Sequence, residues 1–142
     1  NKVKIGTFEG LAYIHNYLFG EIYDFAGKIR TVNISKGDFR FAPLMYLEAS
    51  LEYIDKMPQS NFEQIIEKYV EMNIAHPFRE GNGRLSRLIC DILLAKNGFP
   101  MIGLNLKNGD NYIERVHEGY QCKYEPMQEL LKIKIEEEIT NE

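Results

Sequence analysis

Residues 76–87 read HPFREGNGRLSR, and they separate the two segments of the chain with the clearest helical patterns. Proline disfavours the helical conformation in the residue before it, so we expect a helix to stop at His76. The imidazole is then left at a helix end, where it can face a cavity and accept a proton. Gly81 and Gly83 indicate a tight turn that opens the next helix. This stretch therefore predicts a helix-loop-helix whose loop carries chemistry.

The loop also carries groups that bind phosphate. Gly81, Asn82 and Gly83 lie at the start of the second helix, where free backbone N–H groups and the helix dipole favour an anion. Arg84 and Arg87 lie three residues apart on that helix and so share a face. Two guanidinium groups on one face could hold further phosphate oxygens.

Glu80 places one carboxylate beside these cations, and a single carboxylate together with phosphates is a common way to hold Mg²⁺. Each residue alone has a structural alternative: a histidine at a helix end is usually structural, glycines often only cap helices, and a surface ion pair is worth ~0–1 kcal/mol. Their combination in one short segment favours a site over packing. A two-histidine zinc site is disfavoured, because no second His or Cys lies at ligand spacing. Phe78 is expected to anchor the turn by apolar packing.

The rest of the chain predicts a bundle of helices, because apolar residues recur at helical spacing in several further segments. The first helix is expected to follow Thr7 as N-cap and to end at Gly20, and the second to run from Pro43 to near Pro58. The third is expected to begin with a Ser60–Glu63 capping box and to end at His76, and the fourth to run from Gly83 to a C-cap at Asn97–Gly98. Two further helices are expected, one capped by Asp110 and one that begins at Pro126.

Residues 28–41 break this pattern. Ile29, Val32 and Ile34 precede a turn at residues 35–38, which is typical of a β-hairpin and is the only clear strand signal. The predicted fold class is therefore all-α, mainly helical, with one β-hairpin. No repeat or linker divides the chain, and 142 residues with 44% hydrophobic content suit one core, so we expect 1–142 to form a single domain.

Composition excludes several classes of function. A net charge of -4 argues against a nucleic-acid partner, which is bound mainly through clustered Lys and Arg. No apolar run approaches the ~20 residues of a membrane-spanning helix and the start lacks a secretory signal, so no membrane partner and a cytoplasmic location are expected. Cys90 and Cys122 lie in no CxxC or Cys/His cluster, which disfavours a disulfide framework or a zinc site. The first residue is Asn rather than Met, so we expect further residues outside the chain.

The loop resembles the full signature of the Fic family, HxFx(D/E)GNGRxxR, with every defining position filled. The resemblance extends over nearly the whole chain and includes residues 23–30, YDFAGKIR, before the hairpin. It implies the Fic helical fold, in which a central helix-loop-helix carries the active site and the hairpin forms a flap. It also implies adenylylation of protein hydroxyls, with ATP as donor and Mg²⁺ as cofactor.

The resemblance implies a role for each residue of the motif. His76 would be the general base that deprotonates a Ser, Thr or Tyr hydroxyl for attack on the α-phosphorus of ATP, and pyrophosphate would leave. Glu80 would hold Mg²⁺ between the α- and β-phosphates. Gly81, Asn82 and Gly83 would form the anion hole for the phosphates. Arg84 and Arg87 would orient the β- and γ-phosphates.

Two features outside the motif also gain roles from the resemblance. The hairpin is similar to the family's flap, which aligns a target segment by strand addition, and Lys36, Gly37 and Asp38 at its tip would touch the target. A solvated turn is the alternative for these three residues. Tyr112 lies where family members often place an aromatic residue of the adenine pocket, and core packing explains it equally well.

Regulation is expected to come from outside the chain. Many Fic proteins are held inactive by a helix bearing (S/T)xxxE(G/N), and no such motif occurs here. Overall similarity is to the single-domain bacterial subgroup with a C-terminal inhibitory helix. We therefore expect that helix beyond Glu142, with an antitoxin-like partner as the alternative.

Three alternative functions stay open on sequence. Doc-type toxins phosphorylate their targets, but they carry Lys where this chain has Gly83, which favours AMP transfer. Another nucleotide or a phosphocholine donor is compatible with a motif that binds phosphates rather than a base. A catalytically idle module could bind partners through the flap, although it would have no need of His76. The target, the modified residue, self-modification and the oligomeric state are not determined by the sequence.

Overall fold

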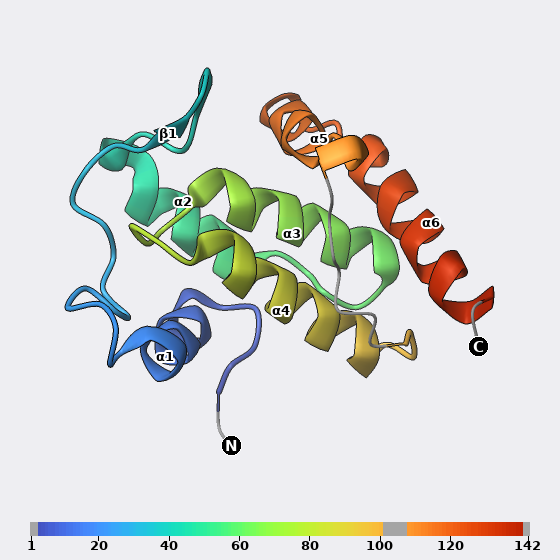
Figure 1. The fold of residues 1–142 in the computed structure, drawn as a ribbon, viewed down its shortest axis with the longest axis horizontal. Helices are drawn as coiled ribbons and strands as arrows, with labels where there is room; N and C mark the ends of the chain where they lie inside the picture. The colour runs from blue at the N-terminus through green and yellow to red at the C-terminus, as the bar shows by residue number, and fades with distance from the viewer. Residues whose placement is uncertain (1–2, 101–107, 141–142) are drawn as a thin grey trace.

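The computed structural model describes residues 3–100 and 108–140 and is mainly helical (Figure 1). The elements follow in the order α1 (Phe8–Phe19), β1 (Ser35–Lys36), β2 (Phe39–Arg40), α2 (Leu44–Lys56), α3 (Phe62–Ala75), α4 (Asn82–Lys96), η1 (Asn108–Asp110), α5 (Tyr112–Glu118), η2 (Gly119–Gln121) and α6 (Glu125–Thr140), where η marks a short 3-10 turn. The predicted class, a helical fold with one hairpin, is confirmed.

Helix α3 forms the centre of the fold. It contacts α2, α4, α5 and α6, and α1 packs against α2 and α4 on the opposite side from α6 (Figure 1). A helix enclosed by neighbours must be apolar on most of its faces, and α3 is buried from Phe62 to Ala75 along nearly its whole length. Because α3 and α4 pack directly on each other, both ends of the loop between them are fixed.

Two of the helix caps expected from sequence are confirmed. The Thr7 side chain accepts a hydrogen bond from the Gly10 N–H at 3.2 Å and so caps α1. Asn97 ends α4, and Gly98 follows with a φ of +91°. These caps are local, since each depends on residues within one turn of the helix end.

The caps expected for α3 and α5 are wrong by one residue. Helix α3 is capped by Asn61, whose side chain accepts from the Gln64 N–H at 2.9 Å, rather than by Ser60. The Gln64 side chain accepts from the Ser60 N–H at 2.9 Å, one residue before the cap, so both hydrogen bonds connect Gln64 to the chain that leads into α3. For α5 the N-cap is Asn111, because Asp110 ends η1 and its carboxylate pairs with Lys134 at 3.0 Å.

The β-hairpin is confirmed but is shorter than expected. Lys36 pairs with Phe39 and Ser35 with Arg40 in antiparallel register, around a two-residue turn. The chain from Ile29 to Val32 is not a strand, contrary to the expectation. Its backbone is bonded instead to the α3–α4 loop, where the Arg30 N–H donates to the Pro77 carbonyl at 2.8 Å. The hairpin lies beside the end of α3 (Figure 1).

The described helices share one apolar core, which runs from Leu11 in α1 to Ile135 in α6. The extent of the domain over residues 1–142 stays a prediction. None of the helices within residues 3–100 and 108–140 combines the length and apolar character needed to cross a bilayer.

Candidate active site

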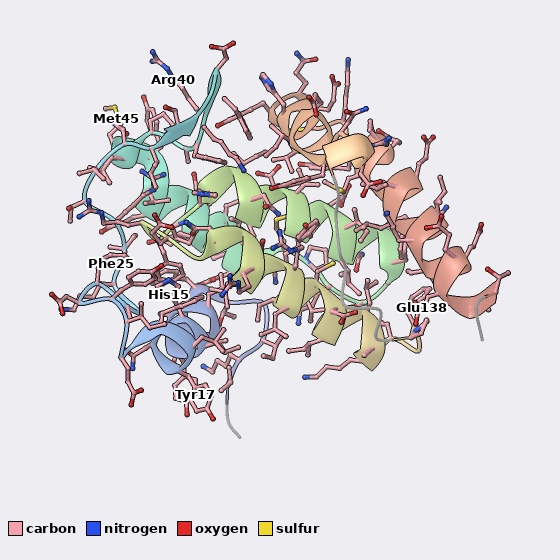
Figure 2. The ribbon with its side chains drawn as sticks, viewed as in Figure 1. His15, Tyr17, Phe25, Arg40, Met45 and Glu138 are labelled. Carbon is pink, nitrogen blue, oxygen red and sulfur yellow. The ribbon has the colours of Figure 1, made fainter. Side chains whose placement is uncertain are left out.

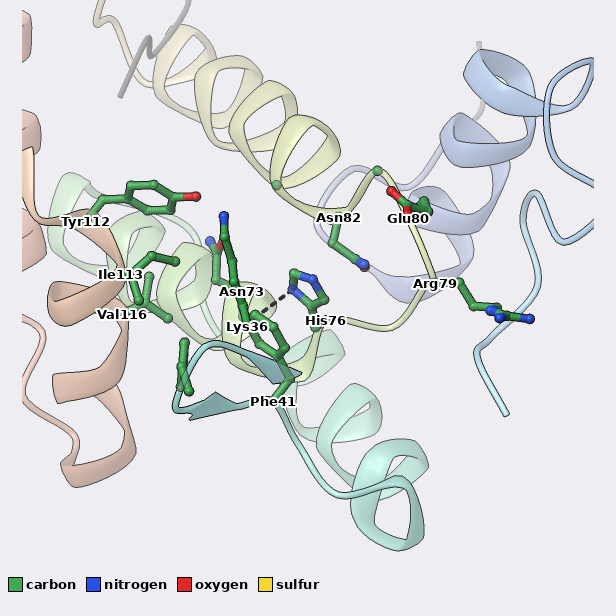
Figure 3. A pocket seen from close by; sticks show the side chains of 13 residues that line it. Lys36, Phe41, Asn73, His76, Arg79, Glu80, Asn82, Tyr112, Ile113 and Val116 are labelled. Atoms are coloured by element: carbon green, nitrogen blue, oxygen red, sulfur yellow. Dashed lines mark hydrogen bonds between the residues drawn. The ribbon is translucent and has the colours of Figure 1, made fainter. Parts of the chain in front are cut away.

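A pocket of roughly 180 Å³ lies between the loop that follows α3, the first turn of α4, the hairpin and α5 (Figure 3). It collects most of the residues that the sequence singled out, although they come from distant parts of the chain. The predicted site residues in its lining are Lys36, His76, Glu80, Gly81, Asn82, Gly83 and Tyr112.

His76 occupies the end of α3, as the following proline predicts. It is the C-cap, with φ 48° and ψ 62°, and its ring stacks on Phe41 with centroids 3.6 Å apart and planes 9° apart. The ring atom Nδ1 lies 3.3 Å from the Asn73 carbonyl (dashed line in Figure 3). A carbonyl can only accept, so Nδ1 carries the hydrogen and Nε2 is left with a free lone pair.

The surroundings of His76 keep its ring neutral. Burial lowers the pKa of His76 to about 4; the hydrogen bond to the Asn73 carbonyl opposes this shift, and the positive charges of Arg30 and Lys36 add to it. At neutral pH the imidazole is therefore unprotonated. A neutral imidazole with a free Nε2 can take a proton from a hydroxyl group placed in the pocket.

The loop presents backbone N–H groups to the same pocket. Gly81 is the N-cap of α4 with φ 84°, and no side chain among the described residues caps the helix. The first N–H groups of α4 are thus available to an anion. The side chain of Asn82 is not, because it accepts from the Phe78 N–H at 2.8 Å and donates to the Phe78 carbonyl at 2.6 Å. Asn82 closes the loop, and only its backbone is left for a phosphate.

Phe78 anchors the loop, as predicted. It is fully buried, and its ring stacks on His15 at 3.9 Å and on Phe8 at 5.8 Å. His15 in turn donates from Nε2 to the Glu80 carbonyl at 2.8 Å and accepts at Nδ1 from the Gly27 N–H at 2.9 Å. Burial lowers the pKa of His15, in keeping with this neutral tautomer. Helix α1, which carries His15 (Figure 2), therefore holds both the anchor and the backbone of the loop.

The charged groups of the motif are divided, with one in the pocket lining and two outside it. Glu80 lines the pocket and is exposed. Arg84 lies over the ring of Phe19 at 5.9 Å, and Nη1 of Arg87 lies 3.2 Å from where a Cβ at residue 83 would be. Neither arginine lines the pocket, so their contacts to phosphate stay predictions. In the part of the chain that the structure describes, no three His, Cys, Asp or Glu side chains gather to hold a metal.

The hairpin is fixed against α5 and η2. Phe39 is only 5% exposed, because the rings of His117 and Tyr120 cover it at 5.1 and 5.7 Å. The Tyr120 hydroxyl also donates to the Arg40 carbonyl on β2. Of the predicted tip residues Lys36, Gly37 and Asp38, only Lys36 reaches the pocket.

Residues 7–94 match the model of the Fic/DOC family. This chain belongs to that family. It is 33% identical over 102 residues to the "Probable protein adenylyltransferase Fic" of Salmonella typhimurium. The aligned region covers 64% of this chain and 51% of that protein. It is 38% identical over 85 residues to the "Protein adenylyltransferase VbhT" of Bartonella schoenbuchensis, covering 52% of this chain and 18% of that protein. The chain thus spans about half the length of the first relative and less of the second.

Solved structures of Fic proteins share the fold at lower identity. The BepC protein from Bartonella tribocorum, solved with bound AMPPNP, superposes with a TM-score of 0.70 at 20% identity over 92% of this chain and 75% of that one. Fic-1 (residues 134–508) from C. elegans gives a TM-score of 0.74 at 20% identity over 95% of this chain and 42% of that one. At this identity the likeness establishes the Fic fold alone.

The sequence did not single out Asn73, although it lines the pocket of this Fic/DOC chain and its carbonyl orients His76. The available signal was a polar residue within the apolar run of α3, three positions before the histidine. Tyr112 has a position compatible with both roles considered for it, the adenine pocket and core packing, because it lines the pocket and also packs against the core.

We expect Gly81→Ala to be more destabilising than Gly98→Ala. Both glycines have a positive φ, 84° and 91°, so each alanine costs about 1–2 kcal/mol of backbone strain. A Cβ at residue 98 meets nothing within 4 Å, whereas one at residue 81 would lie 2.7 Å from a ring carbon of Phe19. Overpacking of this kind adds about 1–3 kcal/mol. Urea unfolding of the two variants measures the difference, and equal midpoints would contradict the prediction.

Proposed function

We propose that this chain is a protein adenylyltransferase, which transfers AMP from ATP to a hydroxyl side chain of another protein. One observation carries the proposal: the free Nε2 of a neutral His76 shares a pocket with the uncapped N-terminus of α4. A proton acceptor therefore lies beside an anion site. The names of the curated relatives and the AMPPNP bound to BepC support the choice of activity and of nucleotide.

The proposed nucleotide site follows from the groups around the pocket. The N–H groups at the start of α4, from Gly81 to Gly83, favour phosphate oxygens. Glu80 would hold Mg²⁺ together with those oxygens and water, because a lone carboxylate plus phosphates suits this ion, and the bound ion would offset negative charge on the phosphates. Tyr112 is our candidate to stack on the adenine, since its ring enters the pocket from α5. Arg84 and Arg87 are our candidates for the outer phosphates.

The chemistry proposed for His76 is a single proton transfer coupled to substitution at phosphorus. The target hydroxyl gives its proton to Nε2, and its oxygen forms a bond to the α-phosphorus of ATP. The bond from that phosphorus to the oxygen bridging to the β-phosphate breaks, and pyrophosphate leaves with the electron pair. The hydrogen bond from Nδ1 to the Asn73 carbonyl stabilises the imidazolium formed at His76.

The partner that we propose is a protein segment in extended conformation. It would add to the outer edge of β1, which has no strand partner among the residues that the structure describes. Lys36 lies at this edge and also lines the pocket, so it connects the docking edge to the reacting groups.

Labelled ATP tests the proposal directly. The purified chain is incubated with Mg²⁺, a bacterial lysate and ATP labelled at the α- or the γ-phosphate. We expect protein bands labelled only from the α-phosphate, and a lane without lysate shows any self-modification. Label from the γ-phosphate would indicate phosphorylation instead. If neither the α- nor the γ-phosphate labels any protein, AMP transfer from ATP is contradicted.

A further inference from the structure

Arg30 is the largest of the fully buried side chains and is 2% exposed, although it carries a positive charge. It lies between the base of the hairpin and the end of α3. Within the described residues no carboxylate pairs with it. A buried charge is costly unless hydrogen bonds replace its contacts with water, so its environment must supply several acceptors.

The acceptors are main-chain carbonyls from three stretches that surround His76. Two belong to the end of α3, one precedes β1 and one follows β2. Nε donates to the His76 carbonyl at 2.7 Å, Nη1 to Val32 at 2.7 Å, and Nη2 to Ala42 at 2.6 Å and to Ala75 at 3.0 Å. The guanidinium of Arg30 thus joins both sides of the hairpin base to the end of the helix that carries the imidazole.

Arginine suits this position for two physical reasons. The last carbonyls of a helix have no partner within the helix, and a cation is favoured at that end. The planar guanidinium also fixes the directions of its donors, whereas the ammonium of lysine is a point charge on a flexible stem. The relative position of hairpin and α3 is therefore set by the shape of the Arg30 side chain as well as by its charge.

We propose that Arg30 is a positioning residue for AMP transfer, which fixes the hairpin relative to the His76 imidazole so that a docked target presents its hydroxyl to Nε2. This inference rests on the proposed function. Arg30 contacts none of the groups assigned to the nucleotide, which lie at the start of α4. Its removal should therefore separate ATP binding from AMP transfer.

The first test compares Arg30→Lys with Arg115→Lys. Arg115 is a matched control, because it also donates to two main-chain carbonyls, those of Asp110 and Pro126, and neither carbonyl belongs to the hairpin or to the end of α3. We expect Arg30→Lys to lower kcat, measured as the rate at which saturating α-labelled ATP labels the lysate protein, roughly 10–100-fold, since small displacements of reacting groups have effects of this size. The Kd for ATP should stay within about twofold. Arg115→Lys should leave both within about twofold.

Arg30→Gln is measured alongside, and the inference is judged on whichever Arg30 variant keeps the wild-type helical circular dichroism. An unchanged kcat would overturn the inference. Equal losses in ATP affinity and in kcat would overturn it as well, because they would indicate a purely structural role.

A distance measurement tests the inference independently of activity. Spin labels are placed at Asp38→Cys on the hairpin tip and Lys96→Cys at the end of α4, in a Cys122→Ser background that removes the exposed thiol. Cys90 is buried and can stay. We expect Arg30→Lys, and not Arg115→Lys, to broaden the distance distribution. If Arg30→Lys broadens the distance distribution but the wild-type protein transfers no AMP, the proposed function is wrong while Arg30 still positions the hairpin. An unchanged distance distribution in Arg30→Lys would overturn the inference.

Discussion

His76→Asn is expected to lower the rate of AMP transfer by about 10²–10⁴-fold, the usual contribution of a general base. The asparagine amide can still donate to the Asn73 carbonyl, as Nδ1 does now at 3.3 Å, and its side chain is smaller than the imidazole, so it fits the same space. It has no basic nitrogen in place of Nε2. The substitution therefore removes the proton acceptor with little change to the end of α3. Steady-state rates with α-labelled ATP measure the effect.

ATP binding provides the control for His76→Asn. The anion site proposed for the nucleotide is formed by the backbone at the start of α4, which His76 does not cap. The Kd for ATP, measured by titration calorimetry, should therefore stay within about twofold of the wild-type value. A variant that keeps more than about a tenth of the wild-type rate would show that His76 is not the base. A parallel loss of ATP affinity would show that the substitution disturbs the pocket itself.

The sequence predicts those parts of the fold that depend on near neighbours. Pro77 determines where α3 ends, because its ring acts on the residue just before it. Gly81 marks the start of α4 for the same local reason. The hairpin turn likewise depends on adjacent residues. Such features follow from spacing alone, and the helix-loop-helix at the centre of the fold is built from them.

The contacts that hold this loop in place could not be predicted in the same way. His15 bonds to the Glu80 carbonyl, 65 positions away in the chain, and Arg30 bonds to the Ala75 carbonyl, 45 positions away. A periodic pattern places His15 on the inner face of α1 but does not say which group it meets there. The expected strand from Ile29 to Val32 failed for this reason, since its partner is a loop and not a second strand.

The positions of the ends of long side chains could not be predicted from helical periodicity either. Arg84 and Arg87 share a helix face by spacing, yet one guanidinium lies over Phe19 and the other beside Gly83. Helical periodicity fixes the direction of a Cβ, whereas the end of an arginine side chain follows the apolar surfaces and charges near it. The sequence therefore identified the pocket and its loop better than the ends of its charged residues.

Phe78→Ala is expected to destabilise the fold by about 3–5 kcal/mol, a large part of the ~5–15 kcal/mol by which a domain is usually stable. The ring is fully buried and stacks on His15 at 3.9 Å and on Phe8 at 5.8 Å. Alanine would leave a cavity between α1 and the loop, and the surrounding rings cannot fill it without moving the His15 imidazole. Urea unfolding followed by circular dichroism measures the loss.

Phe78→Leu is the matched control, because leucine keeps most of the apolar volume and loses only the aromatic stacking. Its expected effect is about 1–2 kcal/mol. Both variants keep the main-chain bonds from residue 78 to Asn82, so the loop can still close in the folded protein. If the two variants unfold at the same urea concentration, stacking rather than cavity formation dominates at this site. A loss below about 1 kcal/mol in Phe78→Ala would show that the ring does not anchor the loop.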